Sequence, residues 1–529
     1  MEEINVVRKP YKRGLLQAAV AYPSLYVAAV KSLSVQMLYF LLNSFDEVAA
    51  ERFVLSRPRG EEPPARSIEG GRALEDFWLI LFSVHYEPDY VNIVRLLRAG
   101  GVHPLARSRE QVVVVGGPPV IANPEPLSEI ADVLVAGEIE TTVPKLVEAA
   151  IEHAGDKRAL LDSLSPKEGF YVPSRGDEEV AYSYPRELPA EYHPTAQVQP
   201  RGDGWRRTTM VEVSRGCSRG CFFCMEGHIF APKRDRPREH VLRIAREGSV
   251  LNGSRHLTLI SLSLLDHPEA DALVAELHEE GYEFSLPSLR LDALTPERLE
   301  LLARSGQRTL VLAPETADFK LSLAIGKPLL KDRLLEVARE ARKVGFRSLK
   351  LYFMVGLPGE EVRDVEKVAE LVREVSAASG FRGPAELKVS VSVFVPKPQT
   401  PMQYFGMEDP ARVKGKLRLL KERVGGVAEV RPYKPAWAYV QGVLARGGRE
   451  LTGLLIEWAL QGGGLGGWRA AARRVGIDVE RYLRPIDPAE EVPWSRVRLW
   501  YPGEALARGY ELCLLHLRGR QSLPLKGRG

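Results

Sequence analysis

The sequence predicts an α/β protein with three parts: a Rossmann-like doubly wound domain, a partial (β/α)6 barrel of the TIM type, and a mostly helical C-terminal domain. Short apolar runs alternate with helical stretches from about residue 14, and a second series of strand–helix units begins near residue 206. After about residue 405 the pattern becomes mostly helical. We therefore expect domains over residues 1–154, 206–402 and 403–529, with a linker over residues 155–205.

The N-terminal part is typical of an open parallel sheet. We expect buried strands at residues 16–22, 77–84, 111–117 and 131–137, and crossing helices at residues 35–43, 89–101 and 141–153. Ligands of such sheets bind at the carboxyl ends of the strands. Gly116, Gly117, Gly137 and Glu138 follow two of these strands and are candidate binding residues. Residues 155–205 are rich in Pro, Asp, Ser and Glu with little periodicity, as in a linker.

The middle part contains six units of strand and helix. We expect strands at residues 209–216, 256–264, 283–290, 309–315, 348–356 and 386–396, and helices near residues 238–250, 268–280, 296–304, 331–344 and 362–377. Strands of one direction, each followed by a helix, favour a partial barrel. The site of such a barrel lies at the carboxyl ends of its strands.

The composition excludes several classes of protein. The chain carries 73 basic and 69 acidic side chains, so a net charge of +4 does not indicate binding to nucleic acid or to an anionic membrane. No run approaches the roughly 20 apolar residues of a membrane span, and the first residues do not resemble a signal peptide. Clustered cysteines without a disulfide framework favour the cytoplasm.

Three of the four cysteines are clustered. Cys217, Cys221 and Cys224 follow the first strand of the middle part with the spacing CxxxCxxC, whereas Cys513 lies far away in an apolar stretch and is expected to be buried. Thiolates bind soft metal centres, and zinc sites usually have four protein ligands. A cubane held by three cysteines leaves one iron open to a small molecule. A purely structural zinc or iron–sulfur site is the alternative.

The stretch SRGCSRGCFFC, with Phe223 before the last cysteine, resembles the radical S-adenosylmethionine (SAM) superfamily. The resemblance implies a [4Fe–4S] cluster on Cys217, Cys221 and Cys224, with SAM chelating the open iron. An electron from the reduced cluster then cleaves SAM and gives a 5′-deoxyadenosyl radical. The reductant would be a protein such as ferredoxin or flavodoxin.

Further SAM contacts are expected where the later strands end. The stretches SLSLLD, PSLRLDAL, LAPETAD and KLYFMVGLPGE resemble the corresponding parts of the superfamily. The residues that the resemblance assigns to SAM binding are Phe223, Ser263, Arg290, Glu315, Lys350 and Gly356. Arg290 and Lys350 interrupt apolar strands, and we also consider substrate contact or simple ion pairing for them.

The stretch VVVVGGPPVIANPEPLSEIADVLVAGE resembles the cobalamin-binding-domain subgroup of this superfamily. The resemblance implies a cobalamin near Gly116, Gly117, Gly137 and Glu138. Families that replace the lower base of cobalamin with a histidine carry DxHxxG after the first strand, but this chain reads AYPSLY there, and His85 follows a later strand. We therefore expect cobalamin with its lower base displaced and no histidine bound to cobalt.

The leading hypothesis is a radical SAM enzyme that methylates an unactivated carbon with cobalamin or forms a carbon–carbon bond. A methylthiotransferase is a second hypothesis, but such relatives need three more cysteines in the N-terminal domain, and none precedes Cys217. An iron–sulfur electron-transfer protein is a third, and an open iron argues against it. The sequence does not name the substrate.

Overall fold

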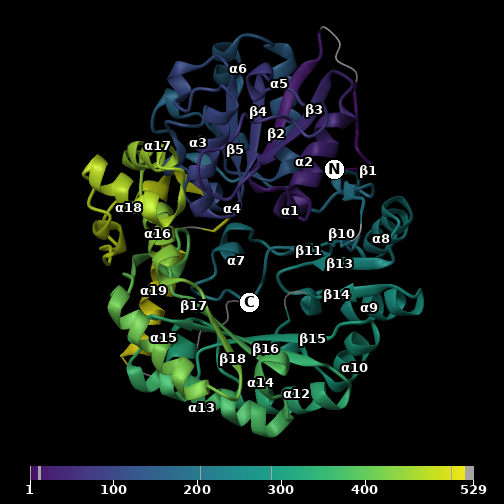
Figure 1. Cartoon of the computed structure of the whole chain (residues 1–529), viewed down its shortest axis with the longest axis vertical. Coiled ribbons are helices and arrows are strands. Elements are labelled where there is room, and N and C mark those ends of the chain that lie inside the picture. The colour runs from purple at the N-terminus through teal and green to yellow at the C-terminus, as the bar shows by residue number, and fades with distance from the viewer. Residues whose placement is uncertain (1, 10–13, 203, 287–288, 502, 519–529) are drawn as a thin grey trace.

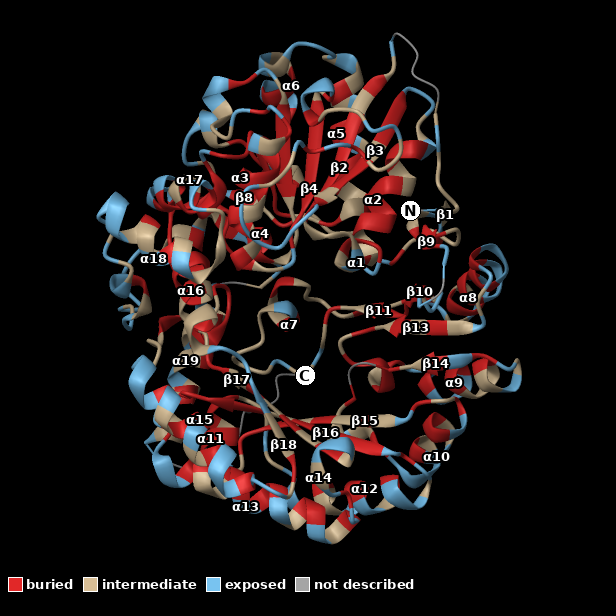
Figure 2. Ribbon diagram, in the orientation of Figure 1, coloured by how far each residue is buried: buried red, intermediate tan, exposed pale blue. Residues whose placement is uncertain are grey.

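The computed structural model describes residues 2–9, 14–202, 204–286, 289–501 and 503–518. Figure 1 shows the N-terminal sheet and its helices at the top, the second set of strands and helices at the bottom, and the last helices along the left-hand side of both. The short helix α7 (Met225–Ile229) lies between the two halves. Buried residues line the sheets and the inner faces of the helices (Figure 2).

The N-terminal sheet has the strand order β3-β2-β4-β5-β6-β7. Its strands are β2 (Leu16–Leu25), β3 (Val48–Leu55), β4 (Leu79–Ser83), β5 (Val112–Gly116), β6 (Val133–Val135) and β7 (Phe170–Tyr171). All pairs are parallel except β6 with β7. The chain leaves β2 for its neighbour on one side and then continues on the other side with β4. The topological switch point, where ligands of doubly wound sheets bind, therefore lies between β2 and β4.

Helices cover both faces of this sheet. Helices α2 (Leu33–Ser44) and α5 (Ile139–Glu152) pack on one face, and α3 (Tyr90–Ala99) packs on the other. The sequence indicated β2, β4, β5 and β6 because their apolar runs are continuous. It missed β3, an edge strand, because Glu51 and Arg52 interrupt its apolar pattern.

The second half consists of parallel strands in two separate sheets. The first contains β10 (Thr209–Glu212), β13 (His256–Ile260) and β14 (Glu283–Ser285), and the second contains β15 (Thr309–Glu315), β16 (Ser348–Val355), β17 (Leu387–Val393) and β18 (Glu429–Pro432). The helices between them are α8 (Arg238–Asn252), α9 (Ala270–Glu279), α10 (Pro296–Arg304), α12 (Lys331–Lys343), α13 (Val362–Ser379) and α15 (Pro410–Val424).

The second half bears out the expected partial barrel of six strands only in part. No pairing joins β14 to β15 in the described residues, so they show no closed barrel. Pro287 and Ser288, which belong to the expected third strand, lie outside the described residues. The seventh parallel strand, β18, follows the expected start of the helical region. Its sequence, EVRP, is too short and too polar to give a strand signal.

The last helices contact both halves. Helices α16 (Pro435–Arg446), α17 (Thr452–Leu460) and α18 (Gly464–Val475) share a core with the N-terminal sheet, in which Trp458 is fully buried. Helix α19 (Gly503–Leu517) packs instead against α11 (Phe319–Ala324) of the second half. Cys513 on α19 is buried, as expected.

Residues 155–205 are more integrated than a simple linker. They contain α6 (Lys157–Ser163) and β7, which extends the N-terminal sheet. Strand β8 (Val180–Ala181) pairs with β19 (Val497–Arg498), and β9 (Gln199–Pro200) pairs with β1 (Glu3–Ile4). None of the described helices is long and apolar enough to cross a membrane.

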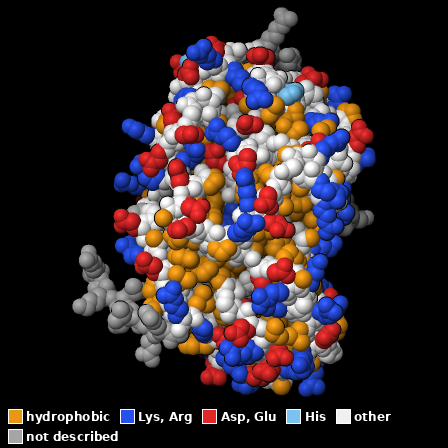
Figure 3. All heavy atoms as spheres, turned by 90° about the vertical axis from the view of Figure 1, so that its left-hand side faces the viewer, with side chains coloured by type: hydrophobic (Ala, Val, Ile, Leu, Met, Phe, Trp, Pro, Cys, Tyr) orange, Lys and Arg blue, Asp and Glu red, His pale blue; other side chains and the backbone are white. Residues whose placement is uncertain are grey.

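The face on the left-hand side of Figure 1 carries a mixed surface. Hydrophobic side chains gather in the middle of this face, and side chains of both charges surround them (Figure 3). The two signs of charge are interspersed there, as the small net charge of the chain suggests.

Glu87 joins all three parts of the chain. Its buried carboxylate follows β4, accepts a hydrogen bond of 2.9 Å from Gln441 on α16, and forms an ion pair with Lys397, which follows β17. Asn123 adds a second junction, because its amide donates to the carbonyl groups of Ala445 and Gly447.

Replacing Lys397 with Met should lower the thermal midpoint of unfolding, because the buried Glu87 loses its cation. The loss should be about 3 kcal/mol, the usual cost of a buried charge without its partner. Lys331→Met, which removes an exposed ion pair with Glu374, is the matched control and should change the midpoint little. Equal midpoints for the two variants would contradict this role of Glu87.

Candidate functional site

The three clustered cysteines lie on one loop at the carboxyl end of β10. The loop begins after the short strand β11 (Ser214–Arg215) and ends where Cys224 precedes α7. Gly216 adopts a φ of +79°, and a methyl group there would lie 2.4 Å from the carbonyl oxygen of Phe230. Only glycine allows the chain to turn so close to the end of α7.

The three cysteines lie near one another on this loop. All three are free and partly exposed. Gly227 lies beside two of them, because a methyl group there would be 3.5 Å from Cys224 Sγ and 3.9 Å from Cys217 Cβ. Nowhere among the described residues do three His, Cys, Asp or Glu side chains converge on one metal ion.

Burial disfavours the thiolate forms of Cys221 and Cys224. Burial raises the pKa of the Cys224 thiol to about 12. Burial also raises the pKa of Cys221, although the cations of Lys327 and Arg290 oppose the shift. Arg290 Nη1 lies 3.9 Å from Cys221 Sγ. Bound iron would supply the positive charge that favours the thiolates. The residues present therefore fit a cluster of the expected kind.

Arg219 fixes the middle of the cysteine loop to the second half. It forms an ion pair with Asp266 and a second one with Asp292 at 2.8 Å. Two of the expected SAM residues belong to the same network: Ser263 donates its hydroxyl to Asp266, and Arg290 Nε lies 3.1 Å from Asp292. Arg219 was not predicted as a site residue, although its position between Cys217 and Cys221 indicated that it lies near the cysteines.

Glu315 lies at the end of β15 and is largely buried. Its φ is +66°, and Lys327 Nζ lies 2.8 Å from its carboxylate. Burial raises the pKa of Glu315, although Lys327 acts against the shift. Lys327 was not indicated by the sequence, yet it also influences Cys221. The pair thus connects an expected SAM residue with the cysteine loop.

The other expected SAM residues have different surroundings. Phe223 packs against a small apolar cluster that includes Met354 and Phe394. Lys350 donates a hydrogen bond of 2.6 Å to the Tyr352 hydroxyl on the same face of β16. Gly356 donates its amide hydrogen to Glu360 at 2.7 Å and lies beside Val413, so its recorded contacts are away from the cysteine loop.

A cavity of about 570 Å³ lies between the two halves and opens at the switch point of the N-terminal sheet. The four residues indicated by the sequence all line it, together with residues of the second half: Gly116, Gly117, Gly137, Glu138, Arg215, Gly216, Ser261 and Leu262. A methyl group on Gly117 would lie 1.9 Å from the carbonyl oxygen of Val84, so this position requires glycine.

The same cavity extends into an apolar recess. The recess lies between the sheet and the helices α2 and α5, and its walls are Met37, Leu38, Leu81, Val114, Val143, Leu146 and Phe170. The cavity therefore has a polar mouth beside the cysteine loop and an apolar end inside the N-terminal sheet. This shape suits a large molecule that has a flat apolar arm.

Two polar groups in the cavity were not assigned from the sequence. His85 Nε2 lies 2.8 Å from Ser34 Oγ, and its ring packs edge-on against Tyr22. Burial lowers the pKa of His85, which favours the neutral imidazole. Glu226 lies on α7 two residues after Cys224, and burial raises the pKa of its carboxyl group.

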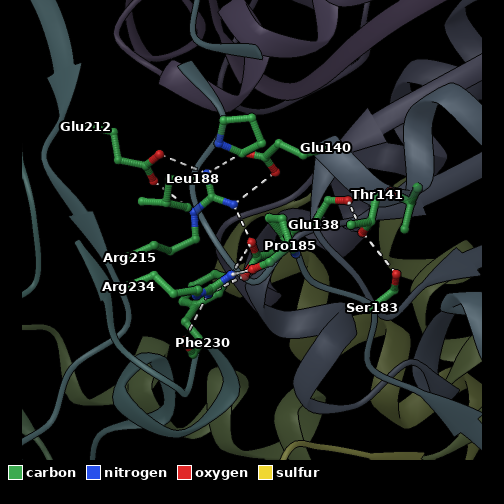
Figure 4. Close-up of polar contacts among 12 residues, drawn as sticks. Glu138, Glu140, Thr141, Ser183, Pro185, Leu188, Glu212, Arg215, Phe230 and Arg234 are labelled. Carbon is green, nitrogen blue, oxygen red and sulfur yellow. Dashed lines mark hydrogen bonds and ion pairs between the residues drawn. The ribbon is translucent and has the colours of Figure 1, made fainter. Parts of the chain in front are cut away.

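A network of charged side chains connects the cysteine loop with the N-terminal sheet (Figure 4). Arg215, two residues before Cys217, forms ion pairs with Glu138 at 2.5 Å, Glu140 at 2.8 Å and Glu212 at 2.8 Å. Burial opposes the charge of Glu212, but Arg215 and Arg236 together outweigh it and hold the pKa of that carboxyl at about 2.

Two further arginines complete this network. Arg234 forms an ion pair with Glu138 at 2.7 Å, and Arg236 forms one with Glu212 at 3.2 Å. The Tyr182 hydroxyl donates to Glu138 at 2.6 Å. Three arginines thus balance three glutamates in a buried setting, as buried charges require.

Glu138→Gln should weaken the contact between the halves, because Arg234 loses the carboxylate with which it pairs and Arg215 loses one of three. We expect the thermal midpoint to fall by an amount that corresponds to about 3 kcal/mol. Glu187→Gln, at an exposed position nearby, is the control. The network has no role in stability if both variants melt like the wild type in scanning calorimetry.

Comparisons with known proteins agree with this geometry. Residues 211–372 match the family model of the radical SAM superfamily, and residues 34–173 match that of the N-terminal region of radical SAM proteins. An uncharacterized protein of Methanocaldococcus jannaschii is 26% identical over 437 residues, which cover 82% of this chain and 89% of that protein. A tRNA-2-methylthio-N(6)-dimethylallyladenosine synthase of Delftia acidovorans is 23% identical over 52% of this chain and 63% of its own.

A solved structure shows the same fold. The radical SAM methyltransferase TsrM from Kitasatospora setae aligns with a TM-score of 0.51 at 14% identity, over 74% of this chain and 75% of TsrM. The two family models support the placement of the chain in the radical SAM superfamily, whose enzymes use a [4Fe–4S] cluster and SAM, whereas the likeness to TsrM shows a similar fold alone.

Proposed function

We propose that this radical SAM enzyme binds a cobalamin in the cavity between its halves and uses it to methylate an unactivated carbon. The observation that carries the proposal is the cavity itself, which joins the switch point of the N-terminal sheet to the cysteine loop. TsrM, which shares the fold, is described as a methyltransferase and has been solved with cobalamin and a [4Fe–4S] cluster bound.

Cys217, Cys221 and Cys224 would hold the cluster. When bound and reduced, the cluster supplies the electron that cleaves SAM. The chain itself holds the loop in place through Arg215 on one side and Arg219 on the other. Arg290 lies near the sulfur of Cys221, where its charge stabilises the thiolate.

The SAM contacts that we propose are the residues expected from the sequence. Ser263, Arg290 and Glu315 have the strongest support, because the networks of Arg219 and Lys327 connect them with the cysteine loop. Phe223 and Lys350 would contribute apolar contact and charge. Gly356 has the weakest support, since its recorded contacts lie elsewhere.

The cavity suits a cobalamin whose lower base is displaced. The displaced base is flat and apolar, and the recess between the sheet, α2 and α5 would accommodate it. The mouth of the cavity exposes backbone without side chains at Gly116, Gly117 and Gly137. The charge of Glu138 is neutralised by two arginines. His85 Nε2 already forms a hydrogen bond with Ser34 Oγ. This contact supports a cobalamin whose cobalt has no histidine ligand.

Methylthiotransfer is a second candidate function, because curated relatives with that activity match about half of the chain. Those enzymes need a second cluster, however, and no cysteine lies among residues 1–216. Carbon–carbon bond formation fits the same two cofactors as methylation. In each case the enzyme requires a reductant, for which we propose ferredoxin or flavodoxin.

The anaerobically reconstituted protein, once reduced with dithionite, should convert SAM to 5′-deoxyadenosine. Cys224→Ala should abolish this reaction, because the cluster loses one of its three ligands. Cys513→Ala is the control and should retain the cluster, since Cys513 is not one of the three expected ligands and is buried on α19 in the apolar cluster against which Phe223 packs. Iron and sulfide analysis with EPR measures the cluster, and chromatography measures the product. A tightly bound zinc, or equal cleavage by the variant, would overturn the assignment.

Hydroxocobalamin mixed with the protein should remain bound through gel filtration, with the spectrum of a displaced lower base. Val143→Phe should abolish retention, because the larger ring fills the recess. Glu148→Phe places the same ring on the exposed face of α5 and should leave retention unchanged. If the wild type retains no corrin, or if EPR of the bound corrin after reduction to cob(II)alamin shows nitrogen from a histidine on cobalt, the cobalamin proposal fails while SAM cleavage is unaffected.

A further inference from the structure

A second cavity, of about 350 Å³, lies beside the first at the junction of the N-terminal sheet and the last helices. Its walls come from the ends of β2 and β3, the loop after β4, and the segment from β18 to α16. The residues that line it are Ser24, Leu25, Leu55, Pro58, Arg59, Tyr86, Pro88, Asp89, Val91, Asn92, Tyr433, Trp437 and Gly464.

The two cavities are close neighbours. Tyr22 and His85 line the first cavity, and the adjacent Tyr86 lines the second. The charge of Asp89, in the second cavity, contributes to the raised pKa of Tyr22. A molecule in the second cavity would therefore lie next to the proposed cofactor site.

The walls are aromatic and apolar. Tyr86 and Tyr433 approach each other through their hydroxyl groups, and Trp437 is half-buried next to the fully buried Trp458. Aromatic side chains provide large rigid surfaces that stack against apolar or aromatic ligands. The volume is that of a site for a small molecule.

Two opposite charges line this cavity without neutralising each other. Asp89 accepts a hydrogen bond of 3.0 Å from Asn92, and no ion pair to it is recorded among the described residues. Burial, with a smaller contribution from Glu87, raises the pKa of Asp89 to about 7, although the Asn92 hydrogen bond acts against the shift. Arg59 is exposed at this cavity, and in the described part of the chain its guanidinium has no ion pair or hydrogen bond.

We propose that the second cavity binds a free amino acid with an apolar or aromatic side chain. The ammonium group would pair with Asp89, the carboxylate with Arg59, and the side chain would pack against Tyr86, Tyr433 and Trp437. A simple organic cation fits less well, because Arg59 would repel it, and an anion would be repelled by Asp89. This site goes beyond the proposed function and does not depend on it.

Equilibrium binding to the full-length protein tests the proposal without cluster or SAM. L-Tryptophan, L-tyrosine and L-leucine are the probes, each compared with its N-acetyl derivative and its methyl ester. We expect at least one free amino acid to bind, and both derivatives to bind about tenfold more weakly, because each lacks one charge.

Asp89→Asn and Arg59→Gln should each weaken binding about tenfold, whereas Asp46→Asn and Arg57→Gln, at exposed positions that do not line the cavity, should not change it. Circular dichroism checks that the variants are folded. The proposal is overturned if no free amino acid binds, if the derivatives bind as well as the parent molecules, or if tetramethylammonium binds and the amino acids do not.

Discussion

The ion pairs of Arg215 are the interaction on which the rest of the site depends. Arg215 stands between the first strand of the second half and Cys217, and its three carboxylate partners come from both halves. Removing so many charges from water is costly, so the pairs stabilise the protein only while every partner remains in place. The cysteine loop thus has one geometry when the two halves are together, and that same contact forms the mouth of the cavity.

Arg219 complements this arrangement. It follows Arg215 by four residues, but its partners, Asp266 and Asp292, come from the second half alone. The loop is therefore held on both sides of Cys217 by cations that point to different partners. The flexible glycines of the loop supply tight turns, and the two arginines supply rigidity. A cluster site needs both, because its ligands must reach different irons and yet remain fixed.

Patterns that are local in sequence could be predicted. The continuous apolar runs indicated β2, β4, β5 and β6. The cysteine spacing predicted cluster ligands, and the three cysteines lie on one loop, so their role stays a prediction. Gly116, Gly117, Gly137 and Glu138 were indicated by their place after strands, and all four line one cavity. What depends on pairing between distant segments could not be predicted. The sequence of β18 has no pattern typical of a strand. The residues around Lys327, Arg219 and Glu87 do not indicate which side chains these three contact. The separation of the second half into two sheets likewise depends on which strands pair, and the hydrophobic periodicity of the sequence does not indicate this pairing.

The position of the last helices has a consequence for how the protein is made. Helices α16 and α17 pack on the N-terminal sheet, and Gln441 on α16 completes the hydrogen bonds of Glu87. Synthesis proceeds from the N-terminus, and domains begin to fold as they emerge. The first sheet and the cysteine loop, with the ion pairs of Arg215 between them, are therefore present on the ribosome before α16. The junction at Glu87 is completed only after the strands of both halves have been synthesised, when α16 leaves the ribosome and docks.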